Sequence, residues 1–160
     1  MLANVGLVRQ LLLLVSTVVL LASALGAAAA TSRVVKVLPH FLDLQGRHAL
    51  SPSLYDRDAY QAQLRQHPEQ RSAIRFDVLW KAKAAANATV KLRLELRGIN
   101  QGNTPRQTSL EKEVKPGTLG RWTSITLGGG DYKNFGEVTA WRVSLWDGDR
   151  LIGEQKSFLW

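Results

Sequence analysis

The sequence of 160 residues contains no cysteine. This absence excludes a disulfide scaffold, thiol catalysis, thiolate metal sites, iron–sulfur clusters and lipid attachment through a lipobox cysteine. Charged residues make up 21% of the chain and aromatic residues 8%, whereas 45% are apolar, which is too many for a disordered chain. We therefore expect about one globular domain that is stabilised by side-chain packing alone.

Residues 1–30 have the composition of an export signal. A single charge, Arg9, precedes an uncharged apolar run over residues 11–25, and a glycine and four alanines follow. This order of charged, apolar and small-residue regions is typical of a secretory signal peptide, with cleavage expected after Ala29 or Ala30. The predicted location of the protein is therefore periplasmic or secreted.

The alternative for the same segment is a membrane anchor formed by residues 11–30. At about 1.5 Å per helical residue this stretch is long enough to cross a bilayer. Two features favour cleavage instead: the last third is alanine and glycine, and no cluster of lysine or arginine flanks the segment. A membrane is expected as a partner only if the segment is not cleaved.

The chain after the signal segment is expected to form one domain. Residues 31–71 read as an N-terminal elaboration with a strand and a helix, and residues 72–160 as the β-sheet body. The body consists of short runs that alternate between apolar and polar residues and are separated by glycine, proline and asparagine. The expected strands cover residues 34–38, 74–80, 90–97, 109–114, 122–127, 138–147 and 151–159.

Strict alternation predicts which side chains face the core. Valine and leucine alternate with charged residues over positions 90–97, and the 74–80 run places Trp80 on its apolar row. In the 138–147 run, Trp141 shares a row with valine and leucine, whereas Trp146 shares a row with serine and arginine. We therefore expect Trp80 and Trp141 in the core and Trp146 outside it.

One helix is expected at residues 54–66. Ser53 stands three residues before Asp56 in an acidic variant of the capping box, and Pro68 ends the helical pattern. The expected apolar stripe of this helix consists of Tyr55, Ala59, Tyr60 and Leu64.

These elements predict a mainly β fold. One N-terminal helix and six or seven short strands close most naturally as an immunoglobulin-like antiparallel β-sandwich. The stretch Trp-Arg-Val-Ser-Leu-Trp-Asp-Gly-Asp-Arg-Leu-Ile-Gly at residues 141–153, closed by Ser-Phe-Leu-Trp at residues 157–160, resembles the last hairpin of exported bacterial immunoglobulin-like modules. The resemblance implies this fold and export from the cytoplasm, and it carries no catalytic residue.

The sequence contains no recognisable catalytic or cofactor motif. G-x-S-x-G does not occur, and the glycines at residues 128–130 lack the ending of a phosphate-binding loop, so we expect a flexible strand connection there. The histidines and acids that lie close together in sequence lack the spacing that places two metal ligands on one helix face. These residues are His40, Asp43, His48, Asp56, Asp58 and His67. We expect no metal, no cofactor and no enzymatic activity, with a small hydrolase as the third-ranked function.

The candidate ligand or partner surface is basic and aromatic. The chain has a formal net charge of +8. Cations on the 74–80 and 90–97 runs form one patch if those two strands pair, and Trp122 and Trp146 are expected on polar faces, either exposed or covered by the helix. The candidate residues are Arg75, Lys81, Lys91, Arg93, Arg97, Trp122, Arg142 and Trp146.

The leading prediction is a non-enzymatic binding or accessory module of the cell envelope that engages another protein by a sheet edge or by exposed aromatic residues. The alternative is a carbohydrate-binding module that uses Trp122 and Trp146 as a stacking platform. Export argues against nucleic acid as a partner.

Overall fold

The computed structural model describes residues 32–83 and 88–160, so the expected signal peptide at residues 1–30 lies outside the described residues. The elements are β1 (Arg33–Asp43), α2 (Leu54–Gln66), the 3-10 turn η1 (Pro68–Gln70), β2 (Arg71–Ala82), β3 (Val90–Ile99), β4 (Pro105–Val114), β5 (Gly117–Gly128), α3 (Gly129–Phe135), β6 (Glu137–Asp147) and β7 (Arg150–Lys156). No helix within these ranges is long and apolar enough to cross a membrane.

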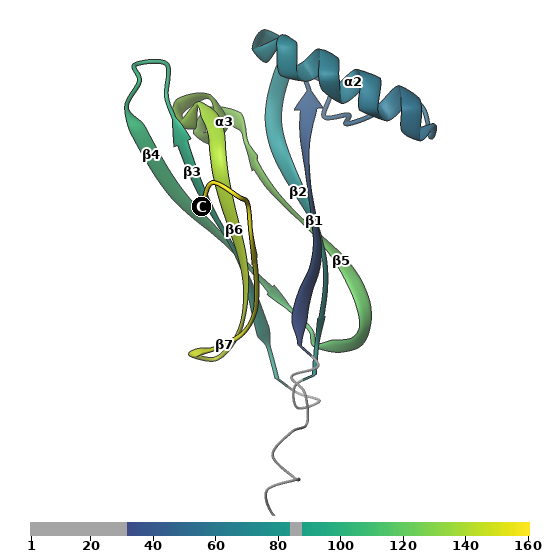
Figure 1. Ribbon diagram of the computed structural model, residues 1–160, viewed down its shortest axis with the longest axis vertical. Coiled ribbons are helices and arrows are strands. Elements are labelled where there is room, and N and C mark those ends of the chain that lie inside the picture. The colour runs from purple at the N-terminus through teal and green to yellow at the C-terminus, as the bar shows by residue number, and fades with distance from the viewer. Residues whose placement is uncertain (1–31, 84–87) are drawn as a thin grey trace, which may run out of the picture. The chain divides into compact units, whose positions relative to one another are not determined.

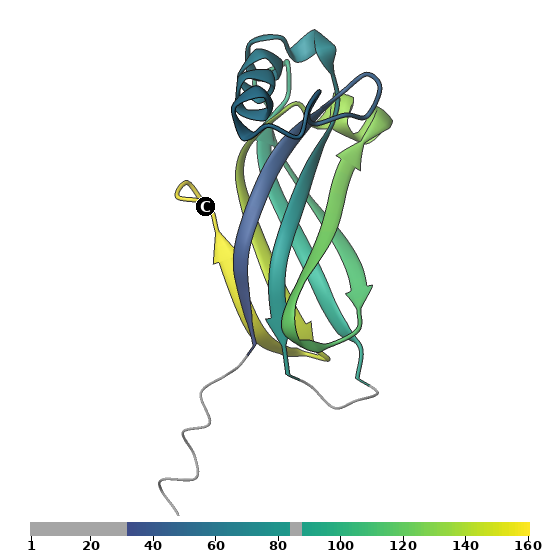
Figure 2. The same cartoon turned by 90° about the vertical axis from the view of Figure 1, so that its right-hand side faces the viewer.

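The strands form two antiparallel sheets. Sheet A has the order β1-β2-β5 and sheet B the order β4-β3-β6-β7. The two sheets lie face to face, as Figures 1 and 2 show, and a single cluster of buried side chains from both sheets lies between them. The mainly β, sandwich-like architecture expected from the sequence is therefore confirmed.

Alternation along the strands gives the predicted core. On β2, Phe76, Val78 and Trp80 are at most 1% exposed, and the alternating apolar residues of β3 from Val90 to Leu96 are completely buried. The indole N–H of Trp80 donates a hydrogen bond of 2.9 Å to the hydroxyl of Thr123 on β5. The largest core side chain therefore has its polar atom satisfied inside the sandwich.

The two sides of the sandwich are closed differently. Where β1 meets β7, a Cβ on Gly153 would lie only 2.9 Å from the Cα of Arg33, so this close approach requires glycine. Where β4 meets β5, the side-chain amine of Lys112 donates to the backbone oxygen of Ser124 at 3.4 Å. A lysine thus covers part of the β5 edge.

Helix α2 has the predicted bounds but not the predicted buried face. The Ser53 hydroxyl accepts from the amide of Asp56 at 3.4 Å, as the capping pattern indicated. Of the expected apolar stripe only Leu64 is buried; Tyr55 is 83% exposed, and the other buried residue of the helix is Gln61. The helix is attached largely through polar groups rather than through an apolar stripe.

Gln61 makes the central attachment of α2. Its side-chain oxygen accepts from the amide of Phe41 at 2.8 Å, and its side-chain nitrogen donates to the backbone oxygens of Phe41 at 2.9 Å and His48 at 2.8 Å. One glutamine side chain therefore bonds to β1 and to the loop that leads into the helix.

A second helix corrects the expectation of one. Residues 128–130 were expected to be a flexible connection, but Gly129 and Gly130 begin α3, whose Tyr132 and Phe135 are buried. Gly129 and Gly136, at the two ends of the helix, have φ angles of 61° and 87°, a region that favours glycine. The glycines therefore shape the ends of a short helix.

Trp141 and Trp146 lie on opposite faces of β6, as the alternation predicted. Trp141 packs against the core with its ring centre 6.3 Å from that of Phe76, although it is only partly buried at the core's edge. Trp146 lies on the outer face, where its indole N–H donates to the hydroxyl of Ser144 at 2.8 Å.

Candidate binding surface

The predicted basic patch is divided between the two sheets. A single patch requires the strands at residues 74–80 and 90–97 to pair with each other. However, β2 lies in sheet A and β3 in sheet B. Sheet A carries Arg75, Lys81 and Trp122, and sheet B carries Lys91, Arg93, Arg97, Arg142 and Trp146. The eight candidate residues therefore belong to two separate faces.

On the outer face of sheet B, acidic residues pair with most of the predicted cations. Glu111 on β4 contacts Lys91 at 3.1 Å and Arg93 at 2.6 Å, and these two cations lower its pKa. Glu95 accepts both arms of the Arg142 guanidinium, at 2.7 and 2.9 Å. This face is a network of ion pairs that leaves little net charge for an acidic partner.

Two tryptophan rings on this side of the molecule already contact arginine side chains. The guanidinium of Arg93 lies 5.2 Å from the ring centre of Trp146. The Trp160 ring lies 4.1 Å from the guanidinium of Arg97 and 4.9 Å from that of Arg142. These indoles already stack on cations of the same chain, so stacking on a ligand would have to displace them.

The outer face of sheet A has a different composition near the start of β1. Trp122 on β5 is 55% exposed. It lies opposite Leu79 on the neighbouring strand β2, and Leu79 in turn lies opposite Lys36 on β1. Arg33 faces Lys81 at the next outward position. We call these five residues the Trp122 surface. Within the described part of the chain, none of its three cations makes an ion pair.

Further along the same face, polar side chains form hydrogen bonds with one another. Asp77 accepts from the Ser124 hydroxyl at 2.6 Å and from Arg75 at 2.9 Å, and His40 lies 3.6 Å away. The carboxylate lies between the hydroxyl and the imidazole, whereas a nucleophilic triad needs the imidazole in the middle. Burial lowers the pKa of His40 despite the opposing effect of Asp77, and burial also lowers the pKa of the neighbouring His48, whose ring centre is 5.3 Å away.

The histidines and acids that lie close together in sequence do not converge on a metal site. Across residues 32–83 and 88–160, no group of three or more histidine or acidic side chains is placed to hold a metal ion. Asp43 instead organises the loop between β1 and α2. It accepts from the amides of Gln45 and Arg47 at 2.9 and 2.8 Å, from the Arg47 side chain at 2.8 Å and from the Tyr60 hydroxyl at 2.7 Å.

These contacts predict that Asp43→Asn destabilises the protein in a pH-dependent way. Burial raises the pKa of Asp43, but the hydrogen bonds from Arg47, Tyr60 and Gln45 outweigh it and lower the pKa from 3.8 to about 2. A lowered folded-state pKa stabilises the protein above pH 3.8, and this contribution is lost as the pH falls toward 2. We expect a loss of about 2 kcal/mol in the free energy of unfolding at pH 7, and almost none at pH 2.

Urea unfolding of the wild type and the variant at both pH values measures this difference. Asp58→Asn is the matched control, because its exposed carboxylate lies on α2 and, in the described part of the chain, forms an ion pair with Arg57 alone, at 3.6 Å. An equal loss at pH 7 and pH 2 would show that the charge of Asp43 does not stabilise the loop.

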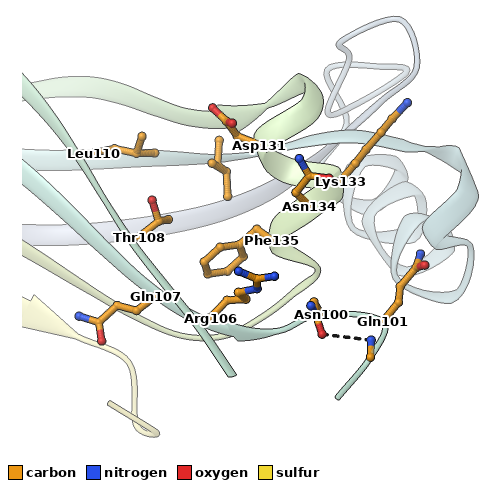
Figure 3. Close-up of a pocket in the computed structure, with 12 residues that line it drawn as sticks. Asn100, Gln101, Arg106, Gln107, Thr108, Leu110, Asp131, Lys133, Asn134 and Phe135 are labelled. Carbon is orange, nitrogen blue, oxygen red and sulfur yellow. Dashed lines mark hydrogen bonds between the residues drawn. The ribbon is translucent and has the colours of Figure 1, made fainter. Parts of the chain in front are cut away.

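A polar hollow of about 610 Å³ lies between α3, β4 and the loop after β3. Figure 3 shows the guanidinium of Arg106 beside the ring of Phe135, whereas the amine of Lys133 extends away from both. Arg106 makes no ion pair in the described part of the chain. The cations of the hollow therefore do not point at one ligand position.

This hollow was not predictable from strand alternation because α3 forms one of its walls. The three glycines at residues 128–130 concealed the helix. Tyr132 and Phe135, three positions apart and followed by Gly136, are the signal that indicates it.

This sequence matches no known family model, no curated protein and no solved structure in the three comparisons made with them. The geometry of this chain itself therefore has to indicate the function. In that geometry, the Trp122 surface combines an exposed aromatic ring with cations that lack an acidic partner in the described residues.

Proposed function

We propose that the chain is an exported, non-enzymatic binding module of the cell envelope with an immunoglobulin-like fold, and that its Trp122 surface binds an acidic region of a protein partner. Support for the fold comes from the seven antiparallel strands of the described residues, which are arranged three on four, with β2 and β3 in opposite sheets and β5 back beside β2. Support for export comes from the composition of residues 1–30.

The exposure of Trp122 is the observation that carries the proposal. A 55% exposed indole beside Leu79 is an apolar centre, and Arg33, Lys36 and Lys81 on β1 and β2 place charges of one sign to one side of it. Tryptophan is enriched among residues that dominate protein interfaces, and rim charges guide the encounter. An acidic surface with a pocket for the indole fits this arrangement.

The carbohydrate alternative is less well supported in its two-tryptophan form. Trp122 belongs to sheet A and Trp146 to sheet B, so one glycan chain cannot stack on both rings as a single platform. A glycan would have to be held by Trp122 alone, with the surrounding cations selecting an acidic sugar.

We expect Trp122→Ala to reduce partner binding at least about tenfold, because interface tryptophans are frequent hot spots. The experiment captures partners from envelope extract on immobilised protein and then measures the affinity of the captured protein for each variant. Trp146→Ala is the matched control and should change the affinity less than about twofold, since Trp146 is stacked on Arg93 of its own sheet.

Two results would count against the proposal. Equal binding by both variants would remove the Trp122 surface from the interface. Quenching of tryptophan fluorescence by a soluble acidic glycan in the wild type but not in Trp122→Ala, together with no captured protein, would establish the glycan alternative.

A further inference from the structure

A second feature lies on another side of the sandwich, where β1 faces the beginning of β6. A cavity of about 450 Å³ opens there between the two sheets. We call it the β1–β6 slot. Its apolar walls are formed by Pro39, Phe41, Ile74, Phe76, Val138 and Trp141. Because several of these side chains also belong to the core or pack against it, the slot leads from the surface to the interior of the sandwich.

The slot is open because β7 is shorter than β6. β7 pairs with β6 only from Arg142 to Asp147. The preceding stretch, 137–141, pairs with β3 on one side, and no described strand pairs with it on the other. Ser157 marks the boundary, because its amide donates to the backbone oxygen of Trp141 at 2.9 Å and its hydroxyl accepts from the Trp141 amide at 3.0 Å.

The open stretch of β6 is a better pairing site than the facing edge of β1. β1 is also the outermost strand of its sheet, but Pro39 lies in the part that borders the slot and has no N–H to donate. A proline on an edge strand discourages the addition of another strand. An added strand would therefore continue the line of β7 along β6.

Several polar side chains around the slot have partners, whereas that of Arg65 has none among the described residues. Gln61 bonds to the backbone of Phe41 and His48, and the buried Arg71 bonds to Glu137 at 2.8 Å. Arg65 also lines the slot, and no described residue forms an ion pair or a hydrogen bond with its guanidinium. The rim thus carries a cation that an acidic group of a ligand would neutralise.

We propose that the slot binds an extended, acidic peptide segment of a partner protein, which pairs with β6 at residues 137–140 and places an apolar side chain inside the slot against Trp141. Strand addition supplies main-chain hydrogen bonds, and pockets for alternate side chains supply specificity. The acidic residue of the segment faces Arg65. This inference goes beyond the Trp122 surface, which takes no part in it.

A defined peptide tests the proposal. The probe is an acetylated and amidated hexapeptide of sequence Asp-Thr-Leu-Thr-Leu-Asp, which carries an acid at each end and leucine at alternate inner positions. Titrated into the ¹⁵N-labelled protein, it should shift the amide resonances of residues 137–141 and of Phe41. It should also slow amide hydrogen exchange over residues 137–140. A second hexapeptide with proline in place of the central threonine should bind at least about tenfold more weakly, because it cannot complete the strand pairing.

The charge contribution is tested by a matched pair of variants. Arg65→Gln should weaken binding of the acidic probe about fivefold, which corresponds to about 1 kcal/mol. Arg106→Gln removes the same charge from the polar hollow beside α3 and should change the affinity less than about twofold. Both arginines are exposed and lack ion pairs in the described residues, so both variants should fold.

Three outcomes would overturn the proposal. One is the absence of shifts at millimolar probe. Another is an equal loss of probe affinity in both arginine variants, which would show that the net charge of the protein, and not Arg65 at the slot, attracts the probe. In the third outcome, neither peptide binds but dodecanoate does, and it shifts the resonances of the slot residues. The slot would then be a cavity for acyl chains. Loss of probe binding at the slot leaves the Trp122→Ala result unaffected, so the two proposals fail independently.

Discussion

Arg71→Met is expected to lower the free energy of unfolding by about 3 kcal/mol and to release α2 from the sandwich. The Arg71 side chain is 3% exposed. It donates to the backbone oxygens of Leu64 and Arg65 at the end of α2, and its guanidinium lies 4.0 Å from the ring centre of Phe41. Methionine has similar length but no donors, so both carbonyl groups would lose their partner.

The release of α2 distinguishes this effect from a general loss of stability. Amide hydrogen exchange should accelerate first in α2, whereas the amides of β3 should continue to exchange only through global unfolding. Arg106→Met is the control, because that arginine is exposed and makes no ion pair in the described residues, and it should change the stability by less than about 0.5 kcal/mol. A loss below about 1 kcal/mol for Arg71→Met would show that the apolar contacts of Leu64 hold the helix.

Trp141→Ala is expected to cost about 3 kcal/mol, at the lower end of the usual range for removing a large aromatic side chain from a core. Trp141 packs against the core and meets the Phe76 ring edge-on, but one part of it remains exposed beside the slot. Against a typical domain stability of roughly 5–15 kcal/mol, this loss would reduce the amount of folded protein that accumulates.

Trp146→Ala, on the same strand, should cost less than about 1.5 kcal/mol. It removes a hydrogen bond to Ser144 and a stacking contact with Arg93 on the outer face, and it opens no cavity in the core. Chemical unfolding curves of the two variants measure both values. Equal losses, or a larger loss for Trp146→Ala, would contradict the assignment of the two rings to opposite faces.

The sequence predicted the strands well because their alternation follows directly from burial on one face. The inward rows of β2 and β3 are buried where the pattern placed them, and the Asp-Gly pair at residues 147–148 forms the expected turn between β6 and β7. Ser53 and Pro68 likewise determined the bounds of α2, since capping and proline act through local backbone geometry.

The contacts between elements were not predictable in the same way. The apolar period of α2 suggested a stripe through Tyr55, but Gln61 provides the attachment through its amide group. Hydrogen bonds of this kind join residues 20 positions apart and leave no periodic signal. For the candidate site, alternation predicted that Trp122 points away from the core, whereas the assignment of β2 and β3 to different sheets decided which cations accompany it.

The neutralised face of sheet B affects how the molecule meets a partner. Glu95 and Glu111 cancel the cations around them, whereas no described acidic residue forms an ion pair with Arg33, Lys36 or Lys81 on sheet A. The two outer faces therefore differ in electrostatic potential, and this difference gives the domain a dipole directed through the sandwich. In the field of an acidic partner the dipole turns the Trp122 surface toward it before contact, so productive encounters become more frequent at low ionic strength and rarer as salt screens the field.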